Sequence, residues 1–258
     1  MQRFYLPPEN CQGRSLQLTG REAHHALHVL RLKNGDPATV LDGAGTTRQC
    51  TVENTAKDVL TLAVRETVTV APLPCPITLL VAVPKGKIIE DIIQKSVELG
   101  VQRIVPLLTA RVVLHLDNEG REAKHEKWQQ VAVEAIKQCG AAWLPSVEAP
   151  QTIEAWLSRR EPVELPLVGS LQTARRHPRE WILEFQEQHG HAPQSASAWI
   201  GPEGDFTPDE LRTIEAAGAR PITLGPLTLR VETAAIYCLS FLNYELRHTA
   251  LENSRQVG

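Results

Sequence analysis

The last quarter of the chain carries two glycine-containing loops whose residue types suit the binding of a small ligand. The first spans residues 198–206, with the sequence Ala-Trp-Ile-Gly-Pro-Glu-Gly-Asp-Phe, and the second spans residues 222–234, with the sequence Ile-Thr-Leu-Gly-Pro-Leu-Thr-Leu-Arg-Val-Glu-Thr-Ala. Each loop follows a short apolar run that predicts a buried strand. Ligands of open parallel sheets bind outside the carboxyl ends of the strands, so we expect both loops at one functional edge. Glycine lets backbone N–H and C=O groups approach a flat or neutral ligand, although each glycine alone could also be a simple turn residue.

Several other site types are excluded by the absence of their sequence patterns. The chain has no Gly-x-Gly-x-x-Gly, no Gly-x-x-x-x-Gly-Lys-Ser/Thr and no Gly-x-Ser-x-Gly segment. Its five cysteines are scattered, with no Cys-x-x-Cys pair. This pattern argues against a zinc site and a disulfide framework, and it fits a reducing cytoplasm. We therefore expect no metal.

Composition is that of an ordinary soluble protein with room for two domains. The 258 residues are 42% hydrophobic and 22% charged, and the formal net charge is −3. A surface for nucleic acid would therefore be a local patch. The N-terminus lacks the apolar segment of a signal peptide, and the longest clean apolar run, residues 77–83, is too short to span a bilayer, so we expect no membrane association.

The chain divides near residue 72, because residues 71–76 contain three prolines and indicate an extended linker. Residues 1–72 consist mostly of short alternating segments, which predict a small β-barrel interrupted by one helix over residues 20–31. The expected strands of this domain cover residues 4–6, 38–42, 48–52 and 59–64.

Residues 73–258 alternate strands with amphipathic helices, so the predicted fold class is α/β, with a mainly parallel sheet covered on both faces. A helix between the two glycine loops begins at Thr207-Pro208-Asp209-Glu210, where Thr207 and Glu210 suit a capping box. The expected strands cover residues 77–83, 103–108, 163–168, 198–200 and 221–224. The other expected helices cover residues 87–99, 122–138 and 233–247.

Motifs along nearly the whole chain resemble those of the RsmE family, which belongs to the knotted SPOUT methyltransferases. The two glycine loops match the family's C-terminal motifs. The other matching segments are residues 3–5, 25–31, 41–43, Lys85-Gly86-Lys87, residues 94–101 and Gln138-Cys139-Gly140. The chain departs from the family pattern at Leu227, where Arg or another polar residue is usual, and at Ala141, where Arg is common.

The resemblance implies a PUA-like RNA-binding domain over residues 1–72 and a SPOUT domain with a trefoil knot over residues 73–258. It also implies S-adenosylmethionine as cofactor, a homodimer, and methylation of N3 of a uridine in bacterial 16S rRNA of the small ribosomal subunit. Two alternatives stay open: a SPOUT enzyme acting on another RNA such as tRNA, and a non-catalytic RNA-binding assembly factor.

The resemblance also implies particular site residues. The implied cofactor-binding residues are Gly169, Ile200, Gly201, Glu203, Gly204, Leu224, Gly225, Leu229, Thr233 and Ala234. The implied RNA-binding residues are Arg3, Tyr5, His25, Arg31, Lys85 and Lys87, each of which alone could equally be solvated surface.

Arg230 and Glu232 are the candidate catalytic residues. Since N3 of uridine carries a proton, methylation requires its removal or stabilisation of the uridine anion. Arg230 is the candidate for stabilising that anion, with a surface ion pair as its alternative role. Glu232 is a candidate base, although a carboxylate in the first turn of a helix also interacts favourably with the helix dipole.

Overall fold

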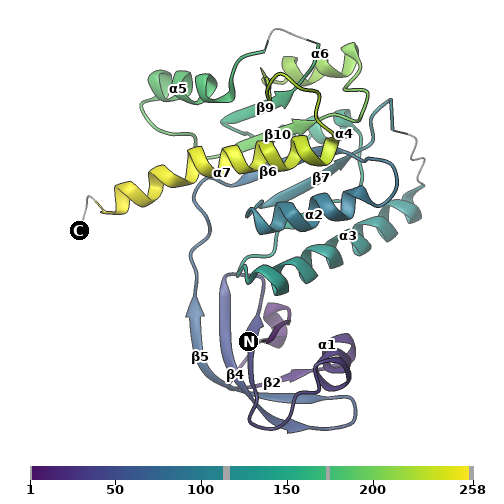
Figure 1. Ribbon diagram of the computed structural model, residues 1–258, viewed down its shortest axis with the longest axis vertical. Coiled ribbons are helices and arrows are strands. Elements are labelled where there is room, and N and C mark those ends of the chain that lie inside the picture. The colour runs from purple at the N-terminus through teal and green to yellow at the C-terminus, as the bar shows by residue number, and fades with distance from the viewer. Residues whose placement is uncertain (1, 113–116, 173–174, 256–258) are drawn as a thin grey trace. The chain divides into compact units, whose positions relative to one another are not determined.

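The protein consists of two compact units, seen in a computed structural model that describes residues 2–112, 117–172 and 175–255 (Figure 1). Unit 1 comprises Met1–Pro72 together with Val133–Leu144, and unit 2 comprises Leu73–Ala132 together with Pro145–Gly258.

Unit 1 is built on a five-stranded sheet with the order β1-β3-β4-β5-β2. Strand β1 is parallel to β3, and the other pairings are antiparallel. The strands are β1 (Gln2–Tyr5), β2 (Ser15–Leu18), β3 (Pro37–Leu41), β4 (Thr46–Thr55) and β5 (Leu60–Thr69). Their inward side chains form one buried core with Phe4, Leu18 and Leu62 among its members. Strand β2 was not predicted. Strands β4 and β5 extend beyond their predicted ranges, and the C-terminal residues of both are exposed.

The helix predicted over residues 20–31 is two shorter elements. Helix α1 (Gly20–His24) continues into a π-helical turn over His25–Val29, and the Leu30 N–H donates to the His25 carbonyl at 2.9 Å. Arg31 then leaves the helical path with φ of 55°. The predicted helix is therefore present over residues 20–29, and its second half has π geometry. Five residues are too few for apolar spacing to distinguish a π turn from an α turn.

Unit 2 contains a six-stranded parallel sheet with the order β11-β9-β10-β6-β7-β8. The strands are β6 (Ile77–Ala82), β7 (Arg103–Leu107), β8 (Ser146–Val147), β9 (Leu165–Gly169), β10 (Ala196–Ile200) and β11 (Arg220–Ile222). All five predicted strands of this sheet are present, with ends shifted by up to two residues. The two-residue β8 was not predicted.

Helices flank this sheet, which confirms the predicted α/β class. They are α2 (Ile88–Glu98), α3 (Asn118–Cys139), α4 (Ile153–Leu157), α5 (Pro178–His189), α6 (Pro208–Ala216) and α7 (Val231–Arg255). Helices α2 and α7 pack against each other and lie in front of the sheet in Figure 1. Helices α4 and α6 bury apolar side chains, including Trp156 and Leu211, in one cluster with Leu80 and Trp199 of the sheet. Helices α4 and α5 were not predicted.

Helix α6 begins as its sequence indicates. The Thr207 hydroxyl accepts from the Glu210 N–H at 3.2 Å, and the Glu210 carboxylate accepts from the Thr207 N–H at 2.8 Å. Pro208 occupies the first turn, where its missing N–H costs no hydrogen bond. This capping box fixes where the helix starts, and with it the end of the loop that follows β10.

Candidate functional site

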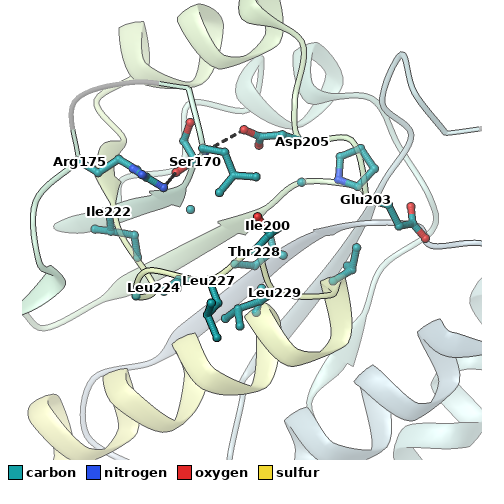
Figure 2. Close-up of a pocket in the computed structure, with 17 residues that line it drawn as sticks. Ser170, Arg175, Ile200, Glu203, Asp205, Ile222, Leu224, Leu227, Thr228 and Leu229 are labelled. Carbon is teal, nitrogen blue, oxygen red and sulfur yellow. Dashed lines mark hydrogen bonds between the residues drawn. The ribbon is translucent and has the colours of Figure 1, made fainter.

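Three loops meet at the carboxyl ends of β9, β10 and β11, which are neighbours in the sheet. The register places Ile200 and Ile222 level with Gly169, so the three strands end together. The loops and the start of α7 enclose a pocket of about 570 Å³, a volume that includes space open to solvent (Figure 2). The pocket is the kind of crevice in which α/β sheets bind ligands.

Most of the predicted cofactor-binding residues line this pocket. They are Gly169, Ile200, Gly201, Glu203, Leu224, Gly225, Leu229 and Ala234. Gly204 and Thr233 do not line it: a Cβ at Gly204 would face the Arg111 side chain at 3.3 Å, and Thr233 is exposed. Backbone groups and apolar side chains therefore make up most of the wall.

The loop after β10 is fixed by a buried carboxylate. Asp205 is 8% exposed and has φ of 63°, a left-handed conformation that non-glycine residues seldom adopt. Its carboxylate accepts from the N–H of Leu171 at 2.9 Å, from Nε2 of Gln172 at 3.2 Å and from the N–H of Phe206 at 2.8 Å. Since Leu171 and Gln172 follow β9, Asp205 ties two walls of the pocket together.

The same loop is held from the side of β7. Arg111 donates through Nη1 to the carbonyl of Gly204 and also lies 3.2 Å from the Asp205 carbonyl. The neighbouring Ala110 N–H donates to Glu210 at 2.7 Å. A Cβ added to Gly201 would lie 3.0 Å from the Phe206 nitrogen, so a side chain there would require the backbone to shift where the loop folds back on itself.

The entry into the loop after β11 is anchored by the segment before α5. The Thr223 N–H donates to the Arg176 carbonyl at 3.0 Å, and Nε1 of Trp181 donates to the Pro221 carbonyl at 3.1 Å. The Arg176 guanidinium lies 4.0 Å from the Trp181 ring centroid and pairs with Glu184 and Glu180. The hydrogen bond to Glu184, with a smaller contribution from Glu180, raises the pKa of Arg176. The Arg176 side chain is therefore occupied by the contacts that anchor the loop after β11.

Beyond Thr223 the second loop is far more exposed. Gly225, Pro226, Leu227 and Thr228 are all exposed, and the Leu227 side chain is 74% accessible. The Thr223 hydroxyl accepts from the Gly225 N–H at 3.3 Å and donates to the Gly225 carbonyl at 3.2 Å. Gly225 has φ of 109°, a conformation that favours glycine.

The two candidate catalytic residues lie beside the pocket and are not among the residues that line it. Helix α7 begins at Val231, two residues earlier than predicted, and the Ala234 N–H donates to the Arg230 carbonyl at 2.8 Å. Arg230 is exposed just before the helix, and Glu232 is half-buried in its first turn. Glu232 therefore has the position of a helix-dipole partner, which was its alternative role.

Outside the predicted cofactor-binding set, nine further described residues line the pocket, and six of them lie within the two predicted glycine loops. The nine are Ser170, Leu171, Arg175, Pro202, Asp205, Ile222, Leu227, Thr228 and Val231. Ser170 and Leu171 directly follow a predicted strand, so the rule that ligands bind at strand ends would have found them. Arg175 carries no such signal, because it comes six residues after β9 ends.

The predicted RNA-binding residues are divided between the two units. In unit 1, Arg3 is exposed and its Nη1 donates to the Gln138 carbonyl at 2.8 Å, while Tyr5 is half-buried and burial raises its pKa. His25 lines a groove together with Arg21 and His24, and Arg31 is exposed. In unit 2, both predicted residues, Lys85 and Lys87, are exposed.

Two other kinds of feature are absent from the described residues. Over residues 2–112, 117–172 and 175–255, no three His, Cys, Asp or Glu side chains are grouped so as to hold a metal ion. Within the same ranges, no helix combines the length and the apolar character needed to cross a membrane.

Comparison with known proteins gives matches along almost all of the chain. Residues 71–243 match the family described as RNA methyltransferase domain, and residues 18–64 match the RNA methyltransferase PUA domain. The ribosomal RNA small subunit methyltransferase E of Synechocystis is 34% identical over 93% of this chain and 77% of its own length. The protein of the same name from Bacillus subtilis is 30% identical over 95% of this chain and 97% of its own length.

Solved structures agree with these sequence matches. A methyltransferase from Legionella pneumophila, solved with the bound cofactor SAM, has a TM-score of 0.83 and 30% identity over 94% of this chain and 96% of its own. The ribosomal RNA small subunit methyltransferase E of Neisseria gonorrhoeae, bound to S-adenosyl methionine, has a TM-score of 0.81 and 26% identity over 95% of this chain and 97% of its own. The chain therefore belongs to the RsmE family of RNA methyltransferases, with an N-terminal PUA domain.

Proposed function

We propose that this protein transfers a methyl group from S-adenosylmethionine to N3 of a uridine in 16S rRNA, acting on the small ribosomal subunit. The observation that carries the proposal is the pocket at the ends of β9, β10 and β11, which gathers eight of the ten residues expected to bind the cofactor. Relatives that match nearly the whole chain bear the name of ribosomal RNA small subunit methyltransferase, and two structural neighbours were solved with this cofactor bound.

The residues of the pocket fit S-adenosylmethionine. Ile200, Ile222, Leu224 and Leu229 provide apolar surface for an adenine ring. The exposed Gly225 carbonyl accepts one hydrogen bond from the Thr223 hydroxyl and offers its second lone pair to the adenine or ribose without adding charge. When bound, the cofactor supplies an electrophilic methyl group on a sulfonium, and the protein supplies position and environment.

Arg230 and Glu232 keep their proposed roles, although neither lines the pocket. During transfer the N3 proton leaves, the N3 electron pair forms the bond to the methyl carbon, and the electrons of the broken C–S bond remain on sulfur. Arg230 directly follows the lining residue Leu229, so its guanidinium can reach a base placed at the mouth of the pocket and stabilise the negative charge. Glu232 in the first turn of α7 is the candidate acceptor of the proton.

RNA binding is proposed for the PUA domain of residues 1–72 and for the two lysines before α2. Arg3, Tyr5, His25, Arg31, Lys85 and Lys87 would contact phosphates or stack on a base. The hydrogen bonds of Arg3 to the carbonyls of Lys137 and Gln138 both use Nη1, which leaves other N–H groups of the same guanidinium for this purpose. We further propose that the SPOUT domain of residues 73–258 is knotted, and that the protein acts in the cytoplasm as a homodimer.

Methylation of small subunits from a strain that lacks its own uridine-N3 enzyme tests the proposal. Labelled S-adenosylmethionine is the donor, and the modified nucleoside is identified by mass spectrometry. We expect N3-methyluridine in 16S rRNA, and at least about a hundredfold slower transfer by the Arg230→Ala variant with unchanged cofactor affinity, as expected for loss of a charge-stabilising donor. The exposed Arg212→Ala on α6 is the matched control and should transfer at the wild-type rate.

Other outcomes of this experiment would replace the proposal. Label in tRNA or in another nucleoside would move the target and leave the cofactor unchanged. Cofactor binding without transfer to any RNA would favour a non-catalytic assembly factor.

A further inference from the structure

We infer that Arg175 binds the carboxylate of the cofactor's methionine end and so sets the direction in which the cofactor lies in the pocket. The inference rests on the proposed function, because it takes this pocket to be the cofactor site. Arg175 is the one cationic side chain among the described residues that line the pocket. The methionine carboxylate is the one anionic group of S-adenosylmethionine.

The geometry leaves Arg175 able to bind a carboxylate. Its Nη1 donates to the Ser170 carbonyl at 3.1 Å, which holds the guanidinium against the loop after β9. A guanidinium carries five N–H donors, so this bond leaves donors in the fork that pairs with a carboxylate. The neighbouring Arg176, in contrast, is engaged by Glu184, Glu180 and the Trp181 ring.

The charges on the pocket wall favour the same direction. Two carboxylates, Glu203 and Asp205, also line the pocket. Asp205 already accepts three hydrogen bonds from the chain, whereas Glu203 is exposed. Figure 2 shows Arg175 and Glu203 on opposite sides of the pocket. A ligand carboxylate is repelled by Glu203 and attracted by Arg175, whereas the ligand's ammonium and sulfonium are attracted by Glu203, so the carboxylate is directed toward the loop after β9.

Two ligands that differ in one group test this inference by isothermal titration calorimetry, without RNA. They are S-adenosylmethionine and its decarboxylated analogue, which keeps the adenosine, the sulfonium and the ammonium. Arg175→Ala should weaken S-adenosylmethionine about 10- to 100-fold, the range of a charge-assisted hydrogen bond, and should change the affinity of the analogue less than about twofold. Arg175→Lys should recover part of the lost affinity, because lysine keeps the positive charge but lacks the two parallel N–H donors of a guanidinium.

Arg179→Ala is the matched control, because Arg179 is an exposed arginine on α5 whose ion pair with Glu245 lies outside the pocket. It should bind both ligands as the wild-type protein does. Equal weakening of both ligands by Arg175→Ala would overturn the inference and assign Arg175 to the shape of the loop. Unchanged binding of both ligands would also overturn the inference, and would indicate that the Arg175 side chain contacts RNA or solvent. If the wild-type protein binds neither ligand, both the proposed function and this inference are wrong.

Discussion

The two glycine loops of the pocket look alike in sequence, and the structure builds them in different ways. The loop after β10 folds back on itself around buried Asp205 and is held by donors from the segments after β7 and β9. The loop after β11 is anchored at Thr223 and then runs exposed through Gly225 and Leu227. The Gly-Pro pair therefore has a different role in each loop. In the loop after β10 the glycine allows a close approach of the backbone, whereas in the loop after β11 it lies in an exposed turn.

This difference assigns separate tasks to the two loops. The loop after β10 is a preformed wall, whose shape is determined before any ligand arrives. The loop after β11 presents its polar backbone and Leu227 to the pocket with little support of its own, so we expect a bound ligand to complete its packing. Preformed walls lower the entropic cost of binding, and exposed segments are those that open locally at low free energy.

Removal of the Asp205 carboxylate should be the most damaging change. In Asp205→Ala the N–H groups of Leu171 and Phe206 lose their partner, and left-handed backbone is retained at a non-glycine residue. We expect the free energy of unfolding to fall by about 2–4 kcal/mol, since one buried and two part-buried hydrogen bonds lose a charged acceptor. Urea denaturation followed by fluorescence measures this loss. Asp205→Asn keeps one acceptor oxygen and should lose less; equal losses would show that the carboxylate is not what holds the wall.

A pair of glycine substitutions compares the two loops directly. Gly201→Ala places a Cβ 3.0 Å from the Phe206 nitrogen, whereas a Cβ at Gly225 meets no atom within 4 Å. We expect Gly201→Ala to cost about 1–3 kcal/mol of unfolding free energy, as overpacking does, and to weaken S-adenosylmethionine at least about tenfold by distorting the wall. Gly225→Ala should cost about 1 kcal/mol through its positive φ alone. Thermal denaturation and calorimetric titration give both quantities, and a larger cost at Gly225 would reverse the comparison.

Leu227 tests whether the exposed loop covers the ligand. Its side chain is 74% accessible, so Leu227→Ala should change the free energy of unfolding by less than about 0.5 kcal/mol. Affinity for S-adenosylmethionine should fall about three- to tenfold if this side chain is buried by the ligand, at about 25 cal/mol for each Å² of apolar surface. Titration calorimetry reads the affinity. An unchanged affinity would show that the loop stays open over the bound cofactor.

Amide hydrogen exchange provides the mildest test, because it needs no substitution. The N–H groups of Leu171 and Phe206 donate to a buried carboxylate and should exchange slowly in the free protein. The exposed amides of Leu227 and Thr228 should exchange fast and become protected when S-adenosylhomocysteine is added. Equal protection of both loops without ligand would remove the distinction between a preformed and a ligand-completed wall.

The sequence by itself determined the class of the fold and the site's location. Apolar runs such as residues 77–83 are buried on both faces of a parallel sheet, so they are recognisable without any tertiary information. The capping box of Thr207 and Glu210 is a local interaction, and it formed where its spacing indicated. Because parallel strands bring their carboxyl ends to one edge, the two glycine loops could also be assigned to one pocket.

Only the tertiary structure decided how the pocket is held and which charges face it. Asp205 reaches Leu171 and Gln172 across more than thirty positions of sequence, and no local pattern specifies such a partner. Arg175 lines the pocket while Arg230 does not, although both follow strands of the same sheet. The side chain that faces a cavity depends on the direction in which each loop leaves its strand. That direction is set by contacts between segments distant in sequence, which periodicity and spacing do not encode.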